Sequence, residues 1–211
     1  MATNQSRWNR HQRGAKRKGI IMSKATIFGK GNMGGAIAGI LTAGGTGVEH
    51  IDTSSENATV NGDLVILAVP YSALSDIAGK YGDQLAGKIV VDITNPIDFT
   101  NFQLAVPADS SAASEVAALL PASIVLKAFN TNFAGSLVGK SVGHNPTTVL
   151  IAGDDEAAKA TLVAAITAGG VGAIDAGALT AARELEALGY LQLQLAVGQK
   201  IGFTGGFTVT K

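Results

Sequence analysis

Three glycines stand at fixed spacing directly after an apolar run near the start of the chain. The run Ala25-Thr-Ile-Phe breaks into Gly29-Lys-Gly31-Asn-Met-Gly34, and small and apolar residues at helical spacing follow. The first glycine permits a tight turn, the second lets phosphate groups approach the backbone, and the third lets a helix pack closely on the strand. Free N–H groups at that helix N-terminus favour an anion. The pattern predicts a site for the pyrophosphate of a dinucleotide.

The glycine pattern alone is weak evidence for a nucleotide site, because a chain with 27 glycines among 211 residues produces such spacings by chance. The residues around it give the further evidence. A strand-like run precedes the pattern and a helical one follows. Asp52 stands 18 residues after Gly34, close to the ~20-residue interval at which an acidic residue reaches the adenine ribose. The alternative is a tight strand–helix turn with no ligand. The context favours a nucleotide site.

Two further segments are expected beside the glycine loop, each at the end of an apolar run. They read Ala68-Val-Pro70-Tyr71 and Thr94-Asn95-Pro96. Ligands of open α/β sheets bind beyond the carboxyl ends of the strands, so these segments are predicted to line the nicotinamide ribose. A third segment, Ala128-Phe-Asn-Thr131, ends another run at the same edge. The alternative interpretation of the first two segments is that they simply terminate strands.

Strand and helix patterns alternate along the chain, which predicts an α/β fold with a doubly wound parallel sheet, a Rossmann-like NAD(P)-binding fold. Only ten polar residues separate Asp52 from the next strand. A crossover helix needs about that many as a minimum, so we expect the usual helix and third strand to be missing and the second strand to lie at or near an edge. Strands are expected at 25–28, 48–53, 63–69, 88–94, 123–129, 148–152 and 172–175, and helices at 32–42, 71–78, 111–120, 155–168 and 178–198.

The last of these helices is apolar nearly all round, with leucines at 185, 188, 191, 193 and 195. More apolar surface is present than one sheet face covers. We therefore predict that residues 178–198 form much of a homodimer interface.

Composition and charge exclude several other classes of function. The chain has no cysteine, which excludes disulfides, thiolate metal sites and a cysteine nucleophile, and its three histidines lie far apart, so no metal site is expected. No apolar run approaches the ~20 residues of a membrane span, so we expect a cytoplasmic protein without a membrane partner. Residues 1–24 carry seven basic and no acidic residues, leaving nine basic against sixteen acidic residues elsewhere, a net charge of −7. No nucleic-acid partner is expected for that body.

This charge distribution predicts that the chain divides into a basic N-terminal extension at 1–22 and a single domain at 23–211. The extension is interpreted as disordered or spurious, with translation beginning at Met22. A targeting segment or a working basic arm are the alternatives.

Six motifs, in this order, resemble the deazaflavin (F420)-dependent NADP oxidoreductases, a group that includes the reductase domain of the STEAP metalloreductases. They are the glycine loop at 29–34, Asp63-Leu-Val-Ile-Leu-Ala-Val-Pro70, Val91-Asp-Ile-Thr-Asn-Pro96, Lys127-Ala-Phe-Asn-Thr131, Ala152-Gly-Asp-Asp155, and the segment from Asp175 to Glu186. The resemblance runs from about Lys24 to Lys211. It implies hydride transfer between NADP(H) and a flavin-like, deazaflavin-like or other small acceptor stacked on the nicotinamide, in an enzyme that is often a dimer.

Members of this family usually bind the 2′-phosphate of NADP with a Ser-Arg pair just after the second strand. Here that place reads Thr53-Ser54-Ser55, without an arginine. Asp52 suits a free 2′-hydroxyl and repels a phosphate, whereas Lys30 supplies a positive charge. The resemblance, together with Lys30 and the two serines, predicts NADP(H). The candidate cofactor-binding residues are Gly29, Lys30, Gly31, Asn32, Met33, Gly34, Thr53, Ser54, Ser55, Ala68, Val69, Pro70, Thr94, Asn95 and Pro96.

The sequence identifies no catalytic residue. Hydride transfer to a flavin-like ring needs chiefly the alignment of two stacked rings. Lys127 and Asn130 are candidate contacts of the acceptor, although a lysine within a strand more often has a structural role. Two other functions stay open: a non-catalytic NADP(H)-sensing protein, and an imine or carbonyl reductase resembling pyrroline-5-carboxylate reductase. The latter needs a proton donor, for which Tyr71 or Lys127 would have to serve.

Overall fold

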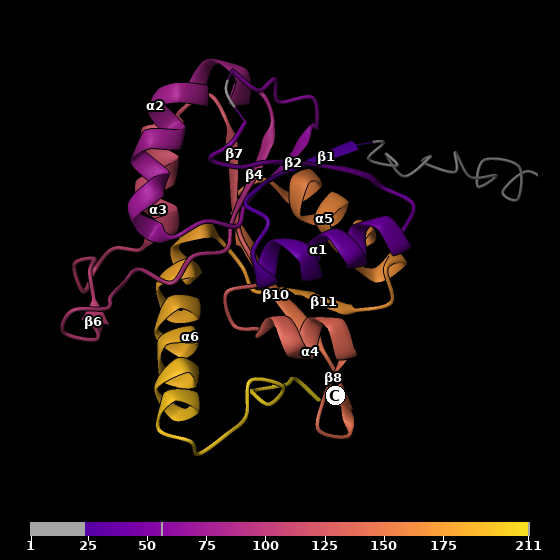
Figure 1. The fold of residues 1–211 in the computed structure, drawn as a ribbon, viewed down its shortest axis with the longest axis vertical. Coiled ribbons are helices and arrows are strands. Elements are labelled where there is room, and N and C mark those ends of the chain that lie inside the picture. Colours follow the sequence, from indigo (N-terminus) through magenta and orange to yellow (C-terminus); the bar gives the residue numbers. More distant parts are fainter. Residues whose placement is uncertain (1–23, 56, 211) are drawn as a thin grey trace, which may run out of the picture.

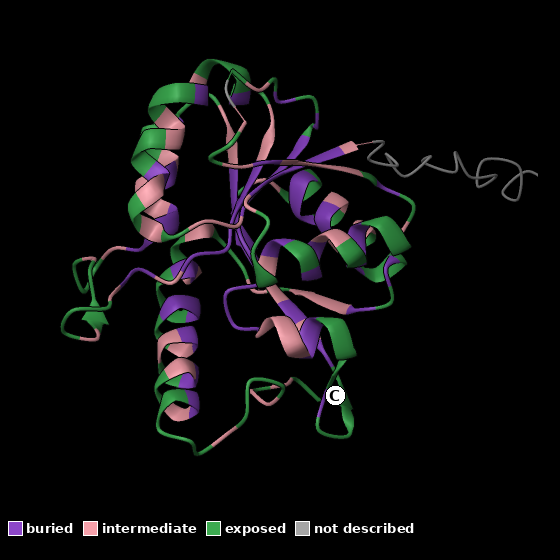
Figure 2. Cartoon of the chain, viewed as in Figure 1, coloured by how far each residue is buried: buried purple, intermediate pink, exposed green. Residues whose placement is uncertain are grey.

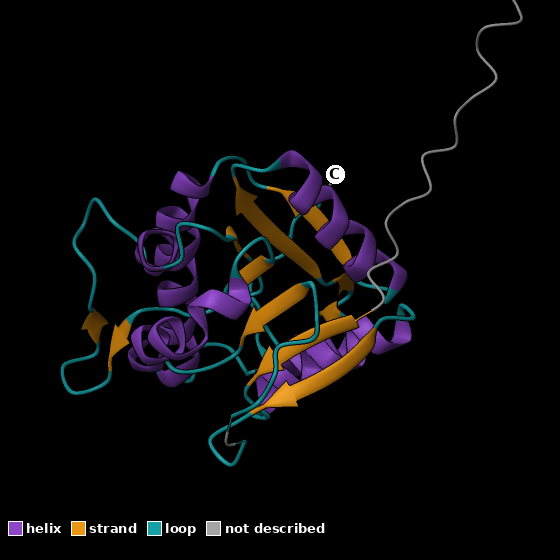
Figure 3. Cartoon of the chain, turned by 90° about the horizontal axis from the view of Figure 1, so that it is seen from above, coloured by secondary structure: helices purple, strands orange, loops and turns teal. Residues whose placement is uncertain are grey.

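The computed structural model describes residues 24–55 and 57–210 (Figure 1); the basic extension predicted at 1–22 lies outside them. A seven-stranded sheet has the order β11-β10-β7-β4-β3-β1-β2. Helices cover both of its faces, as the view from above shows (Figure 3). This is the doubly wound arrangement predicted from the alternating patterns. The strands of the sheet are β1 (Lys24–Phe28), β2 (Gly47–Ile51), β3 (Leu64–Leu67), β4 (Ile89–Asp92), β7 (Ile124–Lys127), β10 (Thr148–Gly153) and β11 (Gly172–Asp175).

The centre of the sheet is parallel and apolar. All four residues of β3 are buried, and β1, β4 and β7 are each buried except at the first residue. Such strands are covered on both faces, which explains their continuous apolar runs. β1 pairs with both β2 and β3, so β2 forms the edge. The prediction from the ten-residue connection is confirmed.

One pair of strands departs from the expected parallel arrangement. β10 runs antiparallel to β7, with Ala152 opposite Lys127 and Gly153 opposite Leu126. After β7 the chain forms only the short helix α4 (Ala134–Gly139) and a hairpin of β8 (Ser141–Val142) and β9 (Asn145–Pro146). No long helix carries the chain back to the opposite end of the sheet. The chain therefore re-enters the sheet at the end where β7 finishes, and β10 runs antiparallel to β7.

Two apolar clusters hold the layers together. On one face α1 (Asn32–Ala43) and α5 (Glu156–Ala168) pack on the sheet through side chains that include Ile37 and Leu162. On the other face α2 (Leu74–Leu85) and α3 (Ala112–Leu119) contribute Leu85 and Val116. A 3₁₀ turn, η2 (Tyr71–Ala73), leads into α2, and a small hairpin of β5 (Ile97–Asp98) and β6 (Gln103–Leu104) precedes α3.

The C-terminal helix α6 (Ala182–Val197) follows the 3₁₀ turn η3 (Leu179–Ala181) and extends below the end of the sheet (Figure 1). Its buried residues form one stripe that includes Glu186, Gly189 and Gln192, while Leu191 is 46% exposed (Figure 2). The chain then turns back as an extended tail, residues 198–210, below the cavity that is described next. No helix in the described part of the chain is long and apolar enough to cross a membrane.

Candidate active site

The glycine loop joins β1 to α1 in a conformation that its glycines require. Gly29 has φ +102°, and a Cβ there would lie 2.2 Å from Ala68 O. A Cβ on Gly34 would lie 2.5 Å from Gly29 O, so both residues permit close backbone approach within the protein. A Cβ on Gly31 would meet nothing within 4 Å. No side chain caps the N-terminus of α1, and its first N–H groups are available to an anion that enters the open space at Gly31.

Four of the predicted residues around the 2′-position gather into one cluster at the end of β2. Lys30 Nζ lies 2.7 Å from Asp52 Oδ2, the Ser54 hydroxyl donates to Asp52 Oδ1 at 2.6 Å, and the Ser55 hydroxyl donates to the same atom at 3.2 Å. The contact with Lys30, and next that with the Ser54 hydroxyl, hold the pKa of the Asp52 carboxyl well below its usual range. Asp52 is therefore charged at neutral pH. Thr53 is exposed beside the cluster.

The segments that follow β3 and β4 lie at the same edge as the glycine loop. The Ala68 N–H donates to Phe28 O at 2.9 Å, which sets the segment 68–70 beside the loop. Thr94 and Pro96 are buried, and the Asn95 side chain is half-buried. Sequence reasoning did not identify His50, whose ring Nδ1 lies 2.8 Å from Gly29 O and donates to it. This contact fixes the carbonyl at the turn of the loop.

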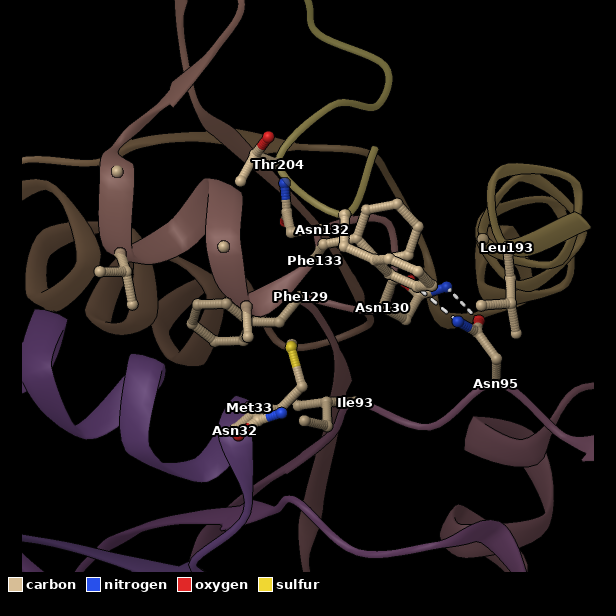
Figure 4. Close-up of a pocket in the computed structure, with 16 residues that line it drawn as sticks. Asn32, Met33, Ile93, Asn95, Phe129, Asn130, Asn132, Phe133, Leu193 and Thr204 are labelled. Carbon is tan, nitrogen blue, oxygen red and sulfur yellow. Dashed lines mark hydrogen bonds between the residues drawn. The ribbon is translucent and has the colours of Figure 1, made fainter. Parts of the chain in front are cut away.

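A cavity of about 830 Å³ opens next to the start of α1 (Figure 4). Its volume falls within the ~300–1,000 Å³ typical of small-molecule sites. Asn32 and Met33 from the predicted set line one side and Asn95 another. The remaining wall comes from the chain after β7, from α4 and α6, and from the tail, where Phe203 packs against Phe133 with 5.1 Å between ring centroids and 60° between ring planes. No titratable side chain is among the residues that line this cavity.

Paired amides close the cavity where α6 meets the strand ends (Figure 4). Asn95 Nδ2 donates to Asn130 O at 2.9 Å, and Asn130 Nδ2 donates both to Asn95 Oδ1 at 2.9 Å and to Leu185 O at 2.8 Å. A Cβ on Gly189 would lie 2.6 Å from Asn95 Oδ1. The glycine therefore lets α6 lie directly on the amide pair. Asn130, a candidate contact of the acceptor, lines the cavity.

Lys127 does not line the cavity, which corrects its assignment as a candidate acceptor contact. Its side chain is fully buried, and Nζ lies 2.7 Å from Asp92 Oδ2, 2.7 Å from Glu186 Oε1 and 2.5 Å from Thr94 O. An ammonium group has three N–H donors, and all three are used here. The lysine has the structural role that the sequence offered as the alternative.

Tyr71, the other candidate proton donor, also lies outside the cavity. Its hydroxyl donates to Glu115 Oε2 at 2.5 Å, and burial, followed by this hydrogen bond, raises the pKa of Tyr71 to about 12. A hydroxyl with that pKa is a poor acid at neutral pH. Neither proton donor that an imine reductase would require is therefore presented to the cavity.

A family model described as NADP oxidoreductase, coenzyme F420-dependent, matches residues 46–96. The F420-dependent NADP reductase of Methanocaldococcus jannaschii is 32% identical over 171 residues, which cover 79% of this chain and 76% of the relative. Metalloreductase STEAP3 of Rattus norvegicus is 39% identical over 140 residues, covering 64% of this chain. The chain spans only 27% of the length of that rat protein.

Solved structures agree on the fold. A provisionally assigned F420-dependent NADP reductase from Arthrobacter sp. FB24 superposes with a TM-score of 0.78 over 90% of this chain and 100% of its own, at 24% identity. A hypothetical protein from Sinorhizobium meliloti gives a TM-score of 0.64 at 28% identity, over 76% of this chain and 87% of its own.

The glycine loop yields a direct test through Gly31→Val. The new side chain enters the open space at the start of α1, so we expect the apo protein to keep its thermal midpoint. An overpacked contact costs about 1–3 kcal/mol, which corresponds to dinucleotide binding weakened roughly 5- to 150-fold. Gly39→Ala, an exposed site in the same helix with nothing within 4 Å of its Cβ, is the control and should leave binding unchanged. Titration calorimetry measures both, and unchanged affinity in Gly31→Val would show that the loop does not hold the phosphates.

Proposed function

The chain belongs to the F420-dependent NADP reductase family, and on that premise we propose that it transfers a hydride between NADP(H) and a flavin- or deazaflavin-like acceptor. The family makes it an NADP-dependent oxidoreductase. The observation that carries the choice of acceptor is the cavity of about 830 Å³ beside the glycine loop, walled by Phe129, Phe133 and amide side chains and lined by no titratable group. Ring-to-ring hydride transfer needs alignment and exclusion of water, and no protein acid.

The residues present fit a bound NADP(H). The uncapped start of α1 and the open space at Gly31 suit a pyrophosphate, and Lys30 with Ser54 and Ser55 suits a 2′-phosphate. The bound nucleotide supplies the hydride. Asn95 and the buried segment that it belongs to form the nicotinamide side of the cavity in this proposal, and Phe133 with Leu193 forms the opposite wall for a planar acceptor.

The two alternative functions have less support from this site. A blocked acceptor pocket beside residues 94–96 would be evidence for a nucleotide sensor, whereas the cavity there is open. An imine or carbonyl reductase needs a proton donor over its substrate. Tyr71 and Lys127 are both occupied elsewhere.

The proposal is tested by mixing the protein with NADPH and, separately, FMN, a deazaflavin or a cyclic imine. We expect loss of NADPH absorbance with a flavin or deazaflavin and none with the imine. Leu193→Trp fills the cavity and should abolish turnover while NADPH still binds. Leu193→Met, which conserves volume, is its control and should keep most of the rate. Turnover with the imine alone would favour the reductase alternative, and NADPH binding without any turnover would favour the sensor.

The nucleotide preference depends on the ion pair between Lys30 and Asp52. We expect NADPH to bind several-fold more tightly than NADH, because Lys30 and the serine hydroxyls can turn from Asp52 to a 2′-phosphate. Lys30→Ala should weaken NADPH more than NADH, and Asp52→Asn should strengthen NADPH because it removes a repulsive carboxylate. Lys24→Ala, whose ammonium pairs with Glu49, is the control for a charge lost from the opposite end of the same two strands. Equal affinities for the two nucleotides, or equal losses in Lys30→Ala, would assign Asp52 to a free ribose hydroxyl instead.

A homodimer completes the proposal. Apolar side chains remain exposed on α6 and on the tail: Leu191 at 46%, Val197 at 56%, Phe203 at 57%, Phe207 at 41% and Val209 at 46%. Their burial against a second copy would remove this surface from water. Light scattering at micromolar concentration should report a dimer, and the double variant Leu191→Glu with Val197→Glu should report a monomer. A monomeric unmodified chain would contradict the proposal.

A further inference from the structure

We propose that Lys127 is a positioning residue, which joins the segment 94–95 to α6 so that both walls of the cavity form one rigid unit. The inference rests on the proposed function for its kinetic readout. Lys127 lies at the end of β7 and touches neither the cavity nor any position expected for a ligand. Its effect therefore passes through the groups that it holds.

The contacts of Asp92 and Lys127 fix the backbone of Thr94. Asp92 is opposite Lys127 in the register of β4 and β7. Its Oδ1 accepts from the Thr94 N–H at 2.9 Å, while its Oδ2 accepts from Lys127 Nζ at 2.7 Å. The same Nζ donates to Thr94 O at 2.5 Å. The backbone N–H and C=O of Thr94 are thus both held, and they set the direction in which the chain enters Asn95.

The contacts of Glu186 fix the position of α6. Glu186 Oε1 lies 2.7 Å from Lys127 Nζ, and its Oε2 accepts from the Ala112 N–H at 3.0 Å at the start of α3. A carboxylate at a helix N-terminus is favoured by the helix dipole. The Lys127 ammonium group therefore joins the helix that carries Gly189 and Leu193 to the segment that carries Asn95. The Asn130 amide forms a second link between the same two elements.

Stability alone is a poor explanation for such a triad. Asp92, Lys127 and Glu186 are 0%, 0% and 1% exposed. Ion pairs buried to this extent are often no more stabilising than apolar residues of the same volume, because each charge loses its hydration. One cation faces two carboxylates, and burial raises the pKa of Glu186 against the effect of Lys127. What an apolar replacement would not reproduce is the fixed geometry at Thr94 and α6.

Alignment of the reacting groups is the quantity that this geometry would control. A misplacement of about 1 Å costs about 100-fold in rate when two reactants must be held together. In the proposed binding mode the nucleotide is held mainly through its phosphates at the glycine loop and the start of α1, and not through the triad. The triad should therefore influence the rate of transfer more than the affinity for NADPH.

The test compares the full chain with the triple variant Asp92→Asn, Lys127→Met and Glu186→Gln. Lys127→Met alone leaves two buried carboxylates without a cation and is expected not to fold. The triple variant removes all three charges but keeps oxygens for the N–H groups of Thr94 and Ala112, so it should fold. Its thermal midpoint should fall, because Thr94 O loses the donor that Lys127 provides. We expect the single-turnover rate at saturating NADPH and flavin or deazaflavin to fall at least about tenfold. The Kd for NADPH should change less than about threefold, and the fluorescence of bound NADPH should shift.

Asp92→Asn alone provides a second measurement, since it leaves one cation facing one anion and folds even if the triple variant does not. It loses one of the contacts of Lys127, so we expect a smaller fall in rate with the same unchanged Kd. Unchanged rates and unchanged nicotinamide fluorescence in the folded variants would overturn the proposal. If the unmodified chain reduces no flavin or deazaflavin, the proposed function fails, whereas the fluorescence of bound NADPH still tests the positioning role.

Discussion

A lysine ammonium buried away from water must find a full set of acceptors, because an unpaired buried charge costs several kcal/mol. Lys127 finds its acceptors on β4, on the backbone that follows β4, and on α6. The placement of α6 follows from this demand. Its buried stripe is interrupted by Glu186, Gly189 and Gln192, so the helix docks through hydrogen bonds and one ion pair and not through a continuous apolar seam. Gly189 then allows contact with the amides of Asn95 and Asn130.

This arrangement separates charge from the cavity. The ionised groups lie behind the strand ends, whereas the cavity itself is walled by aromatic rings, aliphatic side chains and amides. Among these amides, the side-chain oxygens of Asn130 and Asn132 have no hydrogen-bond partner among the described residues. The tail completes the wall, since the Phe207 N–H donates to the buried Gln192 Oε1 at 3.0 Å and Phe203 packs on Phe133. A site of this kind can orient flat rings and exclude water. None of the described residues that line it is titratable, which suits the proposed hydride transfer between two aromatic systems.

Local spacing was enough to predict the glycine loop, the buried strands and the edge position of β2, because each depends on residues close together in sequence. The antiparallel β10 and helix α4 were not predicted. Their direction depends on how the chain returns after β7, which no short-range pattern records. The role of Lys127 was also open, since its partner Asp92 is 35 residues away and Glu186 comes from the last helix. One signal was present: an acid and a base end the neighbouring runs Ile89-Val-Val-Asp92 and Ile124-Val-Leu-Lys127, and these residues meet in register.

The cluster at the end of β2 sets a limit on nucleotide discrimination. An arginine after the second strand would add an unpaired positive charge, whereas here Lys30 is already neutralised by Asp52. In the binding mode that we propose, a 2′-phosphate would have to take the ammonium away from a carboxylate that stays charged. Lys30 is 58% exposed, and water and salt weaken interactions between exposed charges. Specificity is the difference between two affinities, and both the attraction by Lys30 and the repulsion by Asp52 act on the same group. The charges of this cluster thus favour a preference of several-fold for NADPH over NADH, not one of several orders of magnitude.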